Sequence, residues 1–144
     1  MTNSTRDELL ARCDTIEATY EFMLAYAAQG LDGDAQSKSG GELRNYLDRT
    51  SLALDGLADL FSQVVDTEAR QPSDLYATFI DVLEQDARKA RAAVRLVLAQ
   101  PSISSQLIDN MNASIHVRTL LTDLFLLDEV LKPTQPAPAS TSAS

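Results

Sequence analysis

Four cationic side chains between residues 88 and 95 form the first group that could bind a ligand. Arg88, Lys89, Arg91 and Arg95 belong to the chain's 12 lysines and arginines. Arg88, Arg91 and Arg95 share one helical face, because they are spaced by three and four residues. Guanidinium groups bind carboxylates and phosphates through paired hydrogen bonds, so these arginines predict a docking patch for a carboxylate-rich partner or a phosphorylated ligand. A second interpretation is an ordinary solvated face, because acidic residues precede the cations in an order that complements the helix dipole.

The single histidine, His116, is a second candidate for chemistry. A solitary histidine on an acidic helical protein resembles the phosphotransfer modules of two-component signalling, in which an exposed imidazole accepts a phosphoryl group beside a cation and a small residue. Here the cation is displaced to Arg118, and the bulky Leu120 stands where the small residue is expected. The other interpretation is a plain surface or partly buried histidine. Phosphotransfer through His116 is therefore an alternative function and not the leading one.

Metal and cofactor chemistry finds little support in the residue types present. Di-iron bundles need a Glu-x-x-His pair on each of two helices, but Ala113 stands where the glutamate before His116 would be. The only cysteine, Cys13, lies on an apolar seam and is interpreted as a core residue. The sequence contains no nucleophile elbow and no phosphate-binding glycine loop, and adjacent carboxylates such as Asp128 and Glu129 indicate a solvated face. We expect no metal, no cofactor and no catalytic residues, so an enzyme is the less favoured class.

The net charge limits the kinds of partner. With 21 acidic and 12 basic residues the formal charge is −9. Such a surface repels nucleic-acid phosphates and anionic lipid headgroups. No apolar run approaches the length of a membrane span, and the polar first residues are unlike a signal peptide. We expect a cytoplasmic protein that binds another protein or a small molecule, with no nucleic acid and no membrane as partner.

The elements that must position these side chains follow from an apolar repeat. Apolar residues recur at alternating steps of four and three in three segments, and at a broader helical spacing in a fourth. The length of 144 residues suits one core. The sequence thus predicts an all-α, antiparallel (up-down) four-helix bundle as a single domain over residues 1–132, with helices at about 5–29, 42–69, 73–99 and 103–131. The residues expected to face inward are Leu9, Ile16, Tyr20, Leu47, Leu54, Phe61, Ile80, Leu83, Val94, Met111, Leu121 and Leu124.

Two segments outside these helices are rich in polar and small residues. Residues 32–41 read DGDAQSKSGG, and residues 133–144 read PTQPAPASTSAS. Neither segment carries enough apolar side chain to offset the entropy lost on ordering. We therefore expect a mobile loop that folding does not require, and a disordered C-terminal tail whose deletion leaves the melting temperature unchanged.

The last predicted helix carries more apolar residues than one core can bury. Between Leu120 and Leu131 they cover far more than the stripe that a bundle requires. An exposed apolar patch of this kind marks an interface with a partner or with a second copy of the chain. We expect a homodimer in which Phe125, Leu126 and Val130 contribute to the interface.

These observations favour a non-enzymatic adaptor or chaperone-like bundle that binds a protein partner and homodimerises. The size, acidity and helical pattern are similar to those of small secretion and flagellar chaperones, which is a likeness of class without a shared motif. One alternative is the phosphotransfer module acting through His116. The other is a small-molecule-binding bundle whose core cavity is lined by polar residues such as Thr50, Tyr20 and Asn110.

Overall fold

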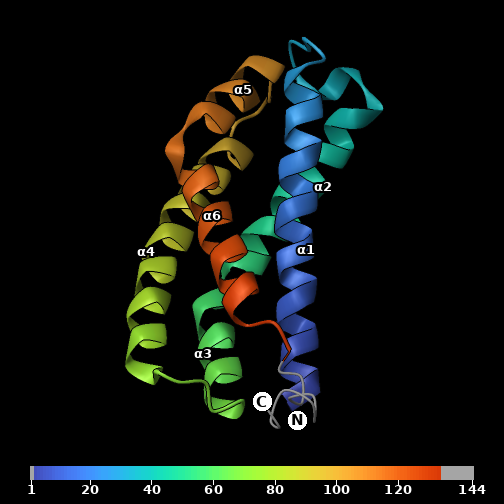
Figure 1. The fold of residues 1–144 in the computed structure, drawn as a ribbon. Helices are drawn as coiled ribbons and strands as arrows, with labels where there is room; N and C mark the ends of the chain where they lie inside the picture. The colour runs from blue at the N-terminus through green and yellow to red at the C-terminus, as the bar shows by residue number, and fades with distance from the viewer. Residues whose placement is uncertain (1, 134–144) are drawn as a thin grey trace, which may run out of the picture.

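The computed structural model describes residues 2–133, and Figure 1 shows the course of the chain. Helix α1 (Thr2–Ala27) is followed by the 3-10 helix η1 (Asp34–Gln36), α2 (Lys38–Leu54), α3 (Leu57–Thr67), α4 (Ser73–Leu98), α5 (Ser105–Ala113) and α6 (Ile115–Val130). No strand occurs within the described residues, which confirms the all-helical fold class. The tail predicted at 133–144 lies outside the described residues, apart from Pro133.

The segment predicted as one helix over 42–69 is divided into α2 and α3, so the prediction is wrong at Asp55 and Gly56. Asp55 is extended, with φ −72° and ψ 119°, and Gly56 is left-handed, with φ 73° and ψ 12°. Glycine adopts a positive φ without steric cost, and aspartate followed by glycine favours a turn. Helix α2 therefore ends at Leu54, and α3 begins at Leu57.

The helix predicted over 103–131 is also divided, at Ser114. This residue is extended, with φ −66° and ψ 148°, and its Oγ hydroxyl donates to the Met111 carbonyl at 2.7 Å. The break changes which side of the chain faces inward, because Ile115 is 69% exposed whereas Val117 is buried. The inward apolar residues of α5 and of α6 therefore lie on two different helical faces. This accounts for the broader apolar spacing of the segment predicted as one helix over 103–131.

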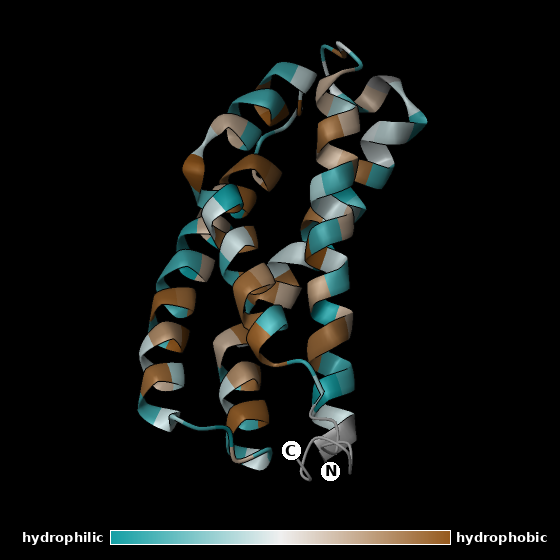
Figure 2. Ribbon diagram, viewed as in Figure 1, coloured by the Kyte–Doolittle hydropathy of each residue, from teal (hydrophilic) through white to brown (hydrophobic). Residues whose placement is uncertain are grey.

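The helices enclose one apolar core, and Figure 2 shows how hydrophobic residues line their facing sides. Helix α1 packs against α2, α3 and α5, and α4 packs against α2, α3 and α6. The residues that the sequence predicted to face inward are buried, except for Tyr20, which is partly buried against the core. The core also takes in Tyr26, which has no exposed surface and whose Oη hydroxyl donates to the Ile103 carbonyl at 2.7 Å.

Residues 32–41 contain η1 and the start of α2, so the prediction that this whole segment is a loop is wrong. The Asp34 carboxylate accepts hydrogen bonds from Arg44 Nε and, at 2.6 Å, from the Ile103 backbone N–H. Arg44 also donates to two backbone carbonyls at and beyond the end of α4, at 3.1 and 2.8 Å. The hydrogen bond from Arg44 is the main reason that the pKa of Asp34 falls to about 2. An ionised Asp34 therefore joins α2 to the connection between α4 and α5.

Candidate protein-binding groove

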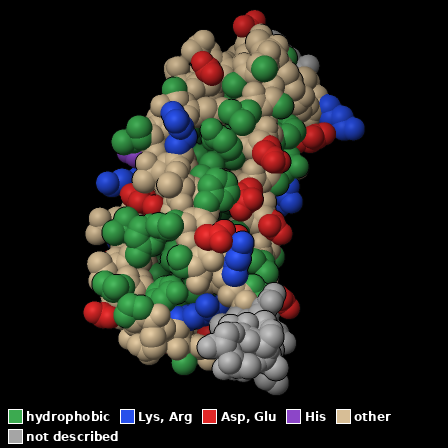
Figure 3. All heavy atoms as spheres, in the orientation of Figure 1, with side chains coloured by type: hydrophobic (Ala, Val, Ile, Leu, Met, Phe, Trp, Pro, Cys, Tyr) green, Lys and Arg blue, Asp and Glu red, His purple; other side chains and the backbone are tan. Residues whose placement is uncertain are grey.

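An apolar groove lies where the first turns of α4 run beside the last turns of α6. The two helices meet at Tyr76, whose Oη hydroxyl donates to the Val130 carbonyl at 3.4 Å. Figure 3 shows hydrophobic side chains gathered over α4 and α6 on this face of the molecule. The groove has a volume of about 330 Å³ and is lined by Pro72, Leu75, Tyr76, Phe79, Leu126, Leu127 and Val130.

The walls of this groove are largely exposed. Leu75 is 64% exposed, Leu126 is 50% exposed and Val130 is 44% exposed. Val82, one turn beyond Phe79 on the same side of α4, is 41% exposed and lengthens the apolar surface. A continuous apolar patch in contact with water is a candidate binding surface, because single exposed apolar residues are common but gathered ones are not.

The three residues predicted as a dimer interface divide between two sides of α6. Leu126 and Val130 line the groove, whereas Phe125 is 56% exposed and is not part of its wall. Phe125 lies on a different side of α6 from Val130, because the two residues are five apart in a helix of about 3.6 residues per turn. The groove also includes Leu75, Tyr76 and Phe79 of α4, which the sequence did not indicate as site residues, whereas the role of Phe125 in an interface stays a prediction.

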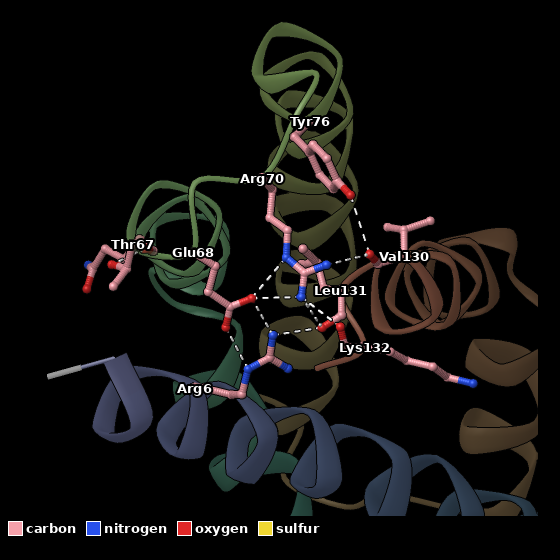
Figure 4. Close-up of polar contacts among 9 residues, drawn as sticks. Arg6, Thr67, Glu68, Arg70, Tyr76, Val130, Leu131 and Lys132 are labelled. Atoms are coloured by element: carbon pink, nitrogen blue, oxygen red, sulfur yellow. Dashed lines mark hydrogen bonds and ion pairs between the residues drawn. The ribbon is translucent and has the colours of Figure 1, made fainter. Parts of the chain in front are cut away.

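One end of the groove is held by Arg6, Glu68 and Arg70, which Figure 4 shows. Arg6 Nε donates to Glu68 Oε2 at 2.8 Å, and Arg70 Nη2 donates to Glu68 Oε1 at 2.8 Å. Arg6 Nη2 also donates to the Leu131 carbonyl at 2.7 Å. Arg70 Nη2 donates to the Lys132 carbonyl at 2.7 Å. Because carbonyls at a helix C-terminus lack partners within the helix, these bonds tie the end of α6 to α1 and to the connection between α3 and α4.

The charges of this cluster suit its position. Burial alone would raise the pKa of Glu68, but the hydrogen bonds from Arg6 and Arg70 outweigh it and hold that pKa below its usual range. Two guanidinium groups around one carboxylate leave a single net positive charge, which faces the negative end of the α6 dipole. The cluster therefore fixes the groove at this end by both hydrogen bonds and charge.

The chain directs Arg70 into this cluster through a left-handed residue that is not glycine. Ala69 has a φ of 53°. The Arg70 backbone N–H donates to the Val65 carbonyl at 3.0 Å, which closes the C-terminal end of α3. Glycine is the usual residue at this position, since a side chain in the left-handed region costs about 1–2 kcal/mol.

The other end of the groove carries two facing carboxyl groups, from Asp86 on α4 and Asp123 on α6. Asp86 lies two turns beyond Phe79, and Asp123 lies one turn before Leu127, so both lie beyond the residues that line the groove. Asp123 is 6% exposed, and its Oδ2 atom has no hydrogen-bond partner in the described part of the chain. Burial, followed by the hydrogen bond and charge of Asp86, raises the pKa of Asp123 to about 7. Near neutral pH the Asp123 carboxyl is therefore partly protonated.

The structure brings Arg88 and Arg91 to one hollow, while Arg95 is exposed outside its wall. Arg91 Nε donates to the Ser51 carbonyl at 3.1 Å, and Arg88 Nε donates to Glu84 at 3.0 Å. Two carboxylates share the wall with the two arginines, so the surface carries mixed charge. The hollow has a volume of about 330 Å³, lies at the break between α2 and α3, and is lined by Leu54, Asp55, Gly56, Glu84, Ala87, Arg88 and Arg91.

His116 lies exposed in the first turn of α6. Arg118 is exposed as well, whereas Leu120 is buried in the core. An exposed imidazole meets the first requirement of a phosphoryl acceptor, because a second protein must reach it. His116 thus stays the alternative site that the sequence predicted.

The polar residues proposed to line a small-molecule cavity differ in burial. Thr50 is buried, and its Oγ1 hydroxyl donates to Thr19 Oγ1 at 2.6 Å. Tyr20 is partly buried, and Asn110 is exposed on α5. Among the described residues, no three histidine, cysteine or carboxylate side chains are placed to hold a metal ion.

Comparisons with known proteins give no indication of function, so a functional proposal depends on the groove. No protein-family model matches the chain, and neither a curated protein nor a solved structure matches it. Across residues 2–133, no helix combines the length and the apolar character needed to cross a membrane.

Proposed function

We propose that this chain is a non-enzymatic, chaperone-like adaptor that homodimerises through the groove between α4 and α6 and binds a protein partner elsewhere on its surface. The observation that carries the proposal is the apolar groove, in which Leu75, Leu126 and Val130 remain about half exposed. A groove between two adjacent helices accepts the apolar side chains of another helix. In a symmetric dimer both copies use the same patch, so the side chains of each copy are covered by the other.

The proposal includes the architecture predicted from the sequence and a cytoplasmic location. In this view the chain is an antiparallel four-helix bundle in which α2 and α3 together form one interrupted helix, and α5 and α6 form another. The packing of α1 and of α4 against both interrupted helices supports this arrangement. The acidic surface, with a formal charge of −9, supports a protein partner over nucleic acid or anionic lipid.

Light scattering of the full chain at micromolar concentration tests the proposed dimer. We expect a dimer for the wild type and a folded monomer for Leu126→Asp, because a charge placed in an apolar interface must lose its water. Leu96→Asp is the matched control, since Leu96 is 67% exposed on α4, the other helix of the groove, but lies outside the groove wall. A wild-type monomer would show that the groove does not bind a second copy.

A second binding surface is proposed at the hollow that Arg88 and Arg91 share, with Arg95 one turn further along α4. The observation that favours it is the approach of two guanidinium groups to one hollow at the break between α2 and α3. A carboxylate-rich peptide would bind there with an affinity that falls as salt is added. Titration with a polyglutamate peptide tests this, and equal binding by the wild type and by Arg88→Gln combined with Arg91→Gln would count against it.

A further inference from the structure

One face of α1 repeats, on the outside of the molecule, the spacing that lines a helix-binding seam. Its residues follow one another at steps of three and four, and we call them the α1 stripe: Asp7, Leu10, Asp14, Glu17, Glu21 and Leu24. Leu10 is 41% exposed and Leu24 is 48% exposed, although another side of α1 fills the core. Figure 3 shows acidic side chains spread over α1. The stripe therefore offers water both apolar and negatively charged surface.

The carboxylates of the α1 stripe lack a cationic partner. Across the described residues, none of them takes part in an ion pair. Of the two arginines on α1, Arg6 pairs with Glu68 at 2.7 Å, and Arg12 pairs with Glu8 at 2.8 Å. The next cation along the sequence is Lys38, at the start of α2. The charge of the stripe is thus left without compensation by its own helix.

The order of charges along α1 also opposes the helix dipole. No cation follows Arg12 on this helix, and its last turn has no basic residue. The dipole favours the reverse order, and like charges three or four residues apart destabilise a helix. Burial, followed by the charges of Asp14, Asp128 and Glu21, raises the pKa of Glu17. These carboxylates therefore cost stability in the free chain, and such local costs are found at functional sites.

A partner that carries positive charge beside apolar side chains matches the stripe. We propose that the α1 stripe binds a basic, amphipathic helix of a different protein. Lysines or arginines of that helix pair with the carboxylates and remove their mutual repulsion, while its apolar side chains cover Leu10 and Leu24. The two leucines are about 21 Å apart along the helix axis, which a partner helix of about 14 residues spans. A second copy does not fit in a symmetric pair, because the two acidic stripes would face each other.

This inference rests on the adaptor function proposed above, for which it names a surface and the chemistry of the partner, and it does not depend on the dimer. Titration of the full chain with a labelled peptide tests it. The probe is a peptide of about 18 leucines and lysines, repeated every seven residues so that the two types occupy opposite faces of a helix. Fluorescence anisotropy of the peptide gives the dissociation constant.

Two triple variants with the same change in net charge locate the binding site. Asp14→Asn, Glu17→Gln and Glu21→Gln together should raise the dissociation constant by about tenfold. The melting temperature of this variant should not fall, because like charges are removed from α1.

The matched control removes three exposed carboxylates from α2, α3 and α4, through Asp48→Asn, Asp66→Asn and Asp81→Asn. We expect this control to raise the dissociation constant by only about twofold, since it weakens the general attraction of the acidic chain alone. Equal losses in the two triple variants would overturn the inference.

The leucines of the stripe supply an independent readout. Leu10→Ser combined with Leu24→Ser should weaken peptide binding by about fivefold, because the partner then loses its apolar contacts. Leu96→Ser is the control, since Leu96 is 67% exposed on α4. An unchanged dissociation constant for the paired leucine variant would show attraction by charge alone and would overturn an amphipathic partner.

The Leu126→Asp background separates the stripe from the groove. Peptide binding should persist in it, because no residue of the α1 stripe lines the groove. Loss of binding in this background would place the peptide in the groove and overturn the inference. A wild-type monomer by light scattering would instead contradict the proposed dimer, and the result for the α1 stripe would stand.

Discussion

Replacing Asp123 with asparagine should stabilise the folded chain at and above neutral pH. The buried carboxyl of Asp123 faces Asp86, and its Oδ2 atom has no hydrogen-bond partner among the described residues. When both carboxyls ionise, two like charges share a site that is largely removed from water. Asparagine keeps the shape of the side chain, carries no charge and can donate a hydrogen bond to Asp86.

The size and pH dependence follow from the raised pKa. The pKa of Asp123 rises from 3.8 to about 7 through burial and then through Asp86, which corresponds to at most about 4 kcal/mol. Asp86 is only partly buried and can turn towards water, so we expect about 2 kcal/mol. Between these two pH values the folded state binds more protons than the unfolded state. The contribution of Asp123 to wild-type stability therefore falls as pH rises from about 4 to about 7 and is level above that range.

Urea unfolding followed by circular dichroism measures this effect. Both chains carry Leu126→Asp, so that self-association plays no part. We expect Asp123→Asn to be more stable by about 2 kcal/mol at pH 8.5 and by about half as much at pH 5.5. Asp81→Asn, an exposed carboxylate on α4, is the control and should show no such trend. An equal difference at the two pH values, or a loss of stability at pH 8.5, would refute the reasoning.

Four further substitutions test other parts of the structure. Ala69→Gly should raise the free energy of unfolding by about 1 kcal/mol, because the residue has a φ of 53°. Glu68→Gln should lower it by about 2–3 kcal/mol, since two largely buried arginines lose their counter-charge. Gly40→Ala should lower the melting temperature, because its Cβ would lie 1.7 Å from a backbone oxygen of η1, whereas Gly41→Ala meets nothing within 4 Å. His116→Gln should leave partner binding intact, and labelled phosphate that passes from a receiver domain to the wild type alone would make phosphotransfer the leading function.

The apolar repeat predicted the helical content and the core, but it concealed both breaks. Leu54 and Leu57 are both buried and continue the spacing of four and three across Asp55 and Gly56. Aspartate before glycine favours a turn, but the apolar repeat runs through these two residues without interruption. At Ser114 no glycine or proline marks the break. The break is indicated only by the spacing of the inward residues, which changes between Met111 and Val117.

The two ends of the groove could not be predicted from the sequence, because each joins residues far apart in the chain. Glu68 meets Arg6 across the molecule, and Asp86 meets Asp123 only because α4 and α6 lie in a particular register. A repeat of apolar residues states which face of a helix is buried. The repeat does not indicate which helix packs against that face, or the axial register of the two helices. The groove depends on both the neighbouring helix and the register.

The groove follows from the geometry of α6. Its inward face already fills the core with Leu120, Leu124 and Leu127, which are nearly fully buried. Leu126 and Val130 point to another side of the helix, so polar residues at those positions would leave the core packing unchanged. The isolated chain therefore gains little stability from them, whereas a binding surface uses them directly. This separation predicts that Leu126→Asp abolishes association with an unchanged melting temperature of the monomer, and a large drop in that temperature would show that the groove belongs to the core.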